Sequence, residues 1–182
     1  MSGDKTPFSH RIDVRSLESG RASSFEVIPD AAILKRIAED LGLSALRKTR
    51  LTGTLVPEGR QDWRLDAALG ATVVQPCIIT GAPVTTRIDV PVQRLYLSGW
   101  QDHDGAGEFE FDGDDEVEPL ESAIDLGQVL VEALALELPE YPRADGAELA
   151  ESSVSPPGAA PIGDDEVKPF AALAQLKDKM KN

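Results

Sequence analysis

Cysteine and histidine are almost missing from this sequence. Its 182 residues contain one cysteine, Cys77, and two histidines, His10 and His103. One cysteine cannot form an intramolecular disulfide, and a structural zinc site needs about four Cys or His ligands. We therefore expect no zinc site built by this chain alone. A nucleophilic cysteine would need one of the two histidines as its base, and no known cysteine-enzyme motif surrounds Cys77.

Aromatic residues and long apolar runs are also scarce. Phe, Trp and Tyr make up 5% of the chain, and no aromatic-rich motif of the kind that stacks RNA bases is present. The most apolar run, Val129–Leu138, is interrupted by two glutamates and is too short to span a bilayer. The first residues lack the pattern of a secretory signal. We expect a soluble cytoplasmic protein without membrane contact, metal or small-molecule cofactor.

Charge is present in excess but is unevenly distributed. The formal net charge is −14. Residues 1–60 have a net charge of +2, residues 61–100 are neutral, and residues 101–182 have a net charge of −16. A strongly acidic chain does not capture nucleic acid by bulk charge. This asymmetry indicates a folded front part joined to acidic interaction or solvating segments.

Two segments have the pattern of amphipathic helices. Residues 29–43 begin with Asp30, a suitable N-cap, and end at Gly42, which suits a positive φ. Residues 124–142 begin with Asp125 as N-cap, and Gln128 is spaced to reach back in a capping box. The apolar face of this second helix consists of Leu126, Val129, Leu130, Ala133 and Leu134.

Apolar residues spaced two apart predict strands over residues 45–57, 62–77 and 83–97. We expect these strands to form an antiparallel meander, with a bulge or corner at Gly70. Residues 8–17 and 23–28 resemble two further strands, paired across a turn at Gly20. The predicted fold is α+β, with the meander forming a small sandwich or partly open barrel packed by two main helices.

The predicted organisation is one α+β domain over residues 1–142, with a flexible acidic loop over residues 99–121 that includes a short strand near Phe109 and Phe111. Residues 143–167 have the composition of a disordered linker. Residues 168–182 predict a short C-terminal amphipathic helix. It would either bind a partner or pack on its own domain, since a helix of this length is marginal in isolation.

Cys77 lies where two predicted strands meet. The residues after it, Thr80, Gly81, Ala82 and Pro83, are typical of a turn. The simplest interpretation is a small, partly buried hydrophobic residue at the end of a strand.

These residues also resemble a known family. "QPCIITGAPVTTRIDVPV", followed by "IDLGQVLVEALALELPEYPR" and "PFAALAQLK", is similar to the YceD family of large ribosomal RNA subunit accumulation proteins, and closest to its alphaproteobacterial branch. The resemblance implies a role in ribosome assembly and no known catalytic activity. Many members have C-x-x-C at this position, and here Thr80 replaces the second cysteine, so metal binding is not transferred. The positions that match family motifs or depart from them are Cys77, Thr80, Pro83 and Asp125.

Arg47, Lys48 and Arg50 form a basic cluster, and Arg11 and Arg15 lie nearby in sequence. These cations could contact RNA phosphates or another partner. They could also be an ordinary solvated strand edge, where Lys and Arg discourage edge-to-edge pairing. The sequence alone favours the solvated edge.

The acidic run contains Asp112, Asp114, Asp115 and Glu116. It could hold a basic ribosomal protein, or it could be a solvated loop, and its spacing does not match a calcium-binding EF-hand loop. The leading hypothesis is a non-enzymatic ribosome-biogenesis factor that binds precursor large-subunit RNA or an assembly protein. The alternative is an acidic adaptor or holdase for a basic ribosomal protein, without RNA contact. Asp and Glu residues are plentiful, but none forms a recognisable pair with a supporting partner, as acid–base catalysis would need.

Overall fold

The computed structural model describes residues 8–18, 20–99 and 116–148. The chain divides into two units, Met1–Asp145 and Gly146–Asn182, and the helices and strands of the described residues all belong to the first. They are β1 (Arg11–Asp13), the 3-10 turn η1 (Val14–Ser16), β2 (Ser23–Val27), α1 (Ala31–Asp40), β3 (Ala45–Glu58), β4 (Asp62–Pro76), β5 (Pro83–Leu97), β6 (Glu116–Pro119), β7 (Ala123–Asp125) and α2 (Leu126–Leu136).

Strands β3, β4 and β5 form the predicted antiparallel meander. β2 pairs antiparallel with β3, and β6 pairs parallel with β5, so the order is β2-β3-β4-β5-β6. Two helices and a mostly antiparallel sheet confirm the α+β class. The sheet is open, because β2 and β6 are its edges and no pairing among the described strands closes it into a barrel. The expected sandwich or partly open barrel is therefore not confirmed.

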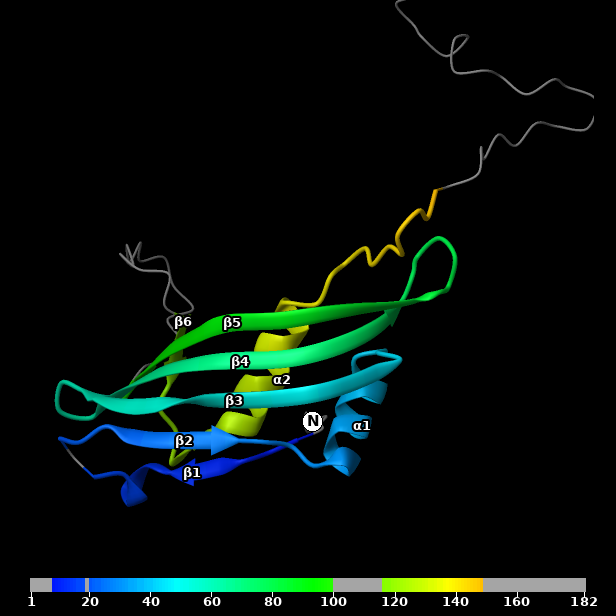
Figure 1. Ribbon diagram of the computed structural model, residues 1–182. Helices are drawn as coiled ribbons and strands as arrows, with labels where there is room; N and C mark the ends of the chain where they lie inside the picture. The colour runs from blue at the N-terminus through cyan, green and yellow to red at the C-terminus, as the bar shows by residue number, and fades with distance from the viewer. Residues whose placement is uncertain (1–7, 19, 100–115, 149–182) are drawn as a thin grey trace, which may run out of the picture. The chain divides into compact units, whose positions relative to one another are not determined.

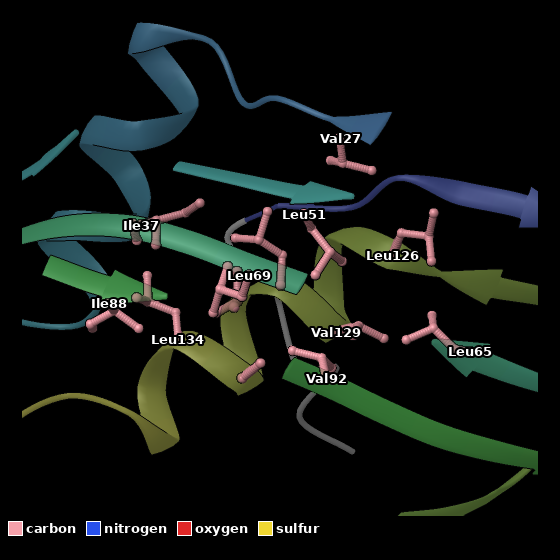
Figure 2. Packing of buried hydrophobic residues seen from close by; sticks show 14 of the residues in the cluster. Val27, Ile37, Leu51, Leu65, Leu69, Ile88, Val92, Leu126, Val129 and Leu134 are labelled. Atoms are coloured by element: carbon pink, nitrogen blue, oxygen red, sulfur yellow. The ribbon is translucent and has the colours of Figure 1, made fainter. Parts of the chain in front are cut away.

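Helix α2 covers one face of the sheet, which we call the inner face (Figure 1). Leu126, Leu130 and Leu134 of α2 are fully buried, as the predicted apolar face requires. Figure 2 shows side chains from α2, from α1 and from the strands pointing toward one another in this core. In the described part of the chain no helix lies on the opposite, outer face (Figure 1).

Both helix N-caps are confirmed. The Asp30 carboxylate accepts a hydrogen bond from Ile33 N at 2.9 Å, and Gly42 after α1 has the expected positive φ of 65°. The Asp125 carboxylate accepts from the backbone N–H groups of Gly127 and Gln128. The prediction of a capping box is wrong, because the Gln128 side chain donates forward along the helix to Glu132 Oε1 at 2.8 Å. None of the described helices has the length and apolar character needed to cross a membrane.

The predicted hairpin between residues 8–17 and 23–28 is wrong. β1 pairs instead with β7, with Ile12 opposite Ile124, and β2 pairs with β3. Side-chain hydrogen bonds support this long-range pairing: the Asp125 carboxylate accepts one from Ser9 Oγ and one from His10 N at 2.7 Å. The N-terminal segment is therefore tied to the start of α2.

The bulge predicted at Gly70 lies on the neighbouring strand. Gly70 continues the regular alternation of β4, between the buried residues Leu69 and Ala71. The register shift falls on β3 between Arg47 and Arg50, and Lys48 within it has a φ of 49°. Gly53 and Gly70 are both in regular strand positions, and at each of them a Cβ atom would be too close to atoms of a neighbouring strand.

Candidate nucleic-acid interface

The β3 bulge gathers cations on the outer face. Arg47 is in register with Thr72 of β4, and Thr72 is in register with Arg87 of β5. On the other side of the bulge, Arg50 of β3 is in register with Gly70 of β4. The pleat of the strands thus brings together four exposed cations that we call the basic face. They are Arg47, Lys48, Arg50 and Arg87.

Arg87 is fixed in place by Asp89 on the same strand. Its Nε donates to Asp89 Oδ2 at 2.7 Å, and its Nη2 donates to Asp89 Oδ1. This hydrogen-bonded fork lowers the pKa of the Asp89 carboxyl, and the nearby Arg50 charge lowers it further. Asp89 therefore stays ionised and orients Arg87 at any physiological pH.

Gly70 is the floor beneath this fork. A Cβ at position 70 would lie 2.6 Å from Arg87 Nη2 and 3.0 Å from Asp89 Oδ1. The guanidinium can lie against the sheet only because position 70 has no side chain. From there Arg87 Nη1 makes two long contacts of 3.4 Å, to Lys48 O and to Thr72 Oγ1. The fork joins β5 to the bulge of β3.

The other three cations of the basic face have no ion-pair partner among the described residues. No ion pair within 4.0 Å is formed by Arg47, Lys48 or Arg50 with any residue that the structure describes. With Asp89 included, the basic face has a net charge of +3 on a chain whose net charge is −14. Unpaired surface cations of this kind are suited to contact phosphates.

A hollow of about 450 Å³ opens beside these cations. Its wall includes Ile28, the residue after β2, whose side chain is 64% exposed. The whole lining consists of Ile28, Lys48, Thr49, Arg50, Thr72 and Arg87.

The structure separates the other two predicted cations from this surface. Arg11 lies in β1 and lines a different hollow together with Glu118, Glu121 and Glu132. Arg15 lies in η1, where its backbone N–H donates to Asp13 Oδ1. Arg87, which the sequence did not single out, joins the cluster instead. The alternation of β5 could have placed Arg87 on the polar face, but nothing in the sequence sets its register against the β3 bulge.

Of the predicted acidic surface, only Glu116 is described. It is the first residue of β6 and is in register with Arg94 of β5. Asp112, Asp114 and Asp115, and the strand expected near Phe109, lie outside the described residues. The predicted C-terminal helix over residues 168–182 also lies outside them.

Cys77 is at the predicted turn. Gly81 N donates to Cys77 O at 2.9 Å, and Gly81 has the positive φ, 73°, that the turn needs. The side chain is more buried than expected, at 3% exposure. Its Sγ accepts from Ile79 N at 3.4 Å and from Ala144 N at 3.3 Å. Within the described ranges no three His, Cys, Asp or Glu residues are placed to hold a metal ion.

These hydrogen bonds stabilise a thiolate. The pKa of the Cys77 thiol is lowered to about 6, and the largest cause is the hydrogen bond from the Thr80 side chain. Ala82 N donates to Thr80 Oγ1 at 3.3 Å, which orients that hydroxyl. Thr80, which replaces the second cysteine of the C-x-x-C motif, thus stabilises the thiolate of the first.

We expect Thr80→Val to raise the pKa of Cys77 from about 6 toward the ordinary thiol value. Valine keeps the shape of threonine but removes the hydroxyl donor that favours the charged form. Thiolate absorbance as a function of pH measures the shift, with Cys77→Ser as the blank. Thr80→Ser retains the hydroxyl and is the control, so its titration should remain near that of the parent. An unchanged midpoint in Thr80→Val would show that the hydroxyl does not stabilise the thiolate.

A family model described as "Large ribosomal RNA subunit accumulation protein YceD" matches residues 65–177. The chain belongs to the YceD family. The matched range begins within β4 and includes the Cys77 turn, Arg87 and Asp125, whereas the cations of the β3 bulge precede it. The YceD description names accumulation of ribosomal RNA and no catalysed reaction. No curated protein and no solved structure matches the chain.

Proposed function

We propose that this YceD-family protein is a non-enzymatic ribosome-biogenesis factor in the cytoplasm that supports accumulation of large-subunit ribosomal RNA by binding precursor RNA through the basic face. Family membership supports the role in RNA accumulation. The observation that supports direct contact is the group of cations Arg47, Lys48 and Arg50 beside Arg87, which Asp89 orients. Among the described residues, these three cations form no ion pair and no helix covers their face of the sheet.

The charge distribution favours contact at this surface over general attraction. A net charge of −14 repels RNA at long range, so binding depends on short-range contacts between cations and phosphates. Each such contact releases counterions, which makes the affinity fall steeply with salt. The acidic segments would then disfavour non-specific RNA, because only an RNA that reaches the basic face gains these contacts.

Reversing Arg47, Lys48 and Arg50 to glutamate together is expected to lower RNA affinity at least tenfold. The slope of log affinity against log salt should decrease by about 2, since each lost phosphate contact removes about 0.7 for a single strand. Cells that depend on this variant should contain less mature large-subunit RNA, with small-subunit RNA unchanged.

The matched control reverses Arg21, Arg36 and Arg60, three exposed cations outside the basic face. It makes the same change in net charge and should leave RNA affinity near that of the parent. Equal losses in both variants would refute binding at the basic face. If RNA accumulation instead depends on Asp112, Asp114, Asp115 and Glu116 and not on the cations, the protein is the acidic adaptor for a basic ribosomal protein.

A further inference from the structure

The hollow on the outer face combines charge with an apolar wall. Lys48, Arg50 and Arg87 contribute cations, Thr72 contributes a hydroxyl, and Ile28 contributes an exposed aliphatic side chain. One exposed isoleucine is ordinary by itself. Its position in this hollow of about 450 Å³ is not, because it places an aliphatic side chain beside three cations that can contact the same ligand. The hollow can hold a ligand with both an anionic and an apolar part.

The position of Ile28 is set by its neighbours. Val27, the last residue of β2, is 2% exposed and packs into the core, and the residue after Ile28 is the buried Pro29. With Val27 directed inward, strand alternation directs Ile28 outward. The backbone therefore directs Ile28 to the outer face.

The bulge supplies the charged side of the hollow. Lys48 has a φ of 49°, a left-handed conformation that is unfavourable for a non-glycine residue. Such strained positions are concentrated at functional sites. Here the bulge aims Lys48 O at Arg87 Nη1, and that contact is long, at 3.4 Å. A phosphate oxygen that reaches Arg87 Nη1 can thus replace this weak contact, while Asp89 still holds Nε and Nη2.

The apolar wall discriminates between forms of RNA. In a duplex the bases are stacked inside, and protein side chains meet phosphates and 2′-hydroxyls. A duplex would therefore gain nothing from Ile28. In a single strand the base faces are exposed and pack on flat or apolar side chains, with little dependence on sequence.

We propose that this hollow binds one nucleotide of single-stranded RNA. Its phosphate lies against Lys48, Arg50 and Arg87 Nη1, and its base packs on Ile28; Asp89 does not line the hollow. This inference rests on the proposed function, since it assumes that RNA reaches the basic face. It adds that the RNA is recognised where it is unpaired.

The test compares a labelled oligouridylate with the duplex that it forms with oligoadenylate, by fluorescence anisotropy on the full chain. We expect the single strand to bind about tenfold more tightly, as one added base contact allows. Ile28→Ala should weaken the single strand about fivefold because buried apolar area is lost. Duplex affinity and both salt slopes should not change.

Ile78→Ala is the matched control, because Ile78 is an aliphatic residue of similar exposure, 51%, in the β4–β5 turn. Thermal unfolding of both variants verifies that they are folded. Duplex binding as tight as the single strand, or unchanged single-strand affinity in Ile28→Ala, would overturn the nucleotide site and leave the basic face as an RNA surface. Binding of neither RNA would reject direct RNA contact and the nucleotide site together.

Discussion

Gly53→Ala is expected to lower the free energy of unfolding by about 3 kcal/mol, the upper end of the usual cost of overpacking. Gly53 of β3 faces Ala67 of β4. A Cβ at position 53 would lie 2.3 Å from Asp66 O and 2.6 Å from Ala67 Cα. These are backbone atoms of the neighbouring strand, so they can move away only if the two strands separate. Urea denaturation followed by circular dichroism measures the loss.

Gly70→Ala is the matched control within the same pair of strands. The atoms that its Cβ would meet first are Arg87 Nη2 and Asp89 Oδ1, which are the ends of exposed side chains that can rotate away. The free energy of unfolding should therefore change by less than about 1 kcal/mol. RNA affinity should fall severalfold, because the fork no longer lies against the sheet. Equal stability losses at positions 53 and 70 would contradict this distinction between backbone and side-chain clashes.

The sequence predicts the parts of this fold that local chemistry determines. The caps at Asp30 and Asp125 need only one carboxylate before an amphipathic run, and both are present. The meander of β3, β4 and β5 follows from alternation that repeats over three long segments joined by short turns. In each case the residues that define the element are close together in the chain.

Pairings over long sequence distances could not be predicted. β1 and β7 are more than 100 residues apart, and Arg11 faces Asp125. The pattern of either segment alone also suits a hairpin, so the sequence predicts pairing with the nearer partner, residues 23–28. The same limit explains the bulge: Gly70 is a plausible position, but the extra residue lies on the neighbouring strand, between Arg47 and Arg50.

The sequence predicts only those residues of the candidate site that are neighbours in the chain. Arg47, Lys48 and Arg50 are neighbours in the sequence, so their clustering was visible. The role of Arg87 depends on register across two strand pairs and on the absence of a side chain at Gly70. Arg11 was grouped with the cluster by sequence distance alone, and the β1–β7 pairing places it among carboxylates. A local pattern identifies charges, whereas the sheet decides which of them share a surface.

Arg94→Ala is expected to destabilise the fold by about 3 kcal/mol, the low end of the cost of breaking a buried ion pair. The Arg94 side chain is 4% exposed and pairs with Glu118 of β6 and with Glu132 of α2, the latter at 3.3 Å. One buried cation of β5 thus holds both the edge strand and the helix. Its removal leaves two carboxylates facing the same site, although water can reach each of them, which limits the loss.

Arg64→Ala is the matched control on β4. Arg64 also contacts two carboxylates, Asp66 at 3.2 Å and Glu58 at 3.9 Å, but its side chain is 40% exposed. Ion pairs exposed in this way contribute less than about 1 kcal/mol. Hydrogen exchange should rise at the β6 amides in the Arg94 variant and not in the Arg64 variant, because Arg94, unlike Arg64, pairs with both β6 and α2. If Arg94→Met, which keeps the apolar stem, is as stable as the parent, packing rather than charge holds β6, and the ion pairs contribute no stability.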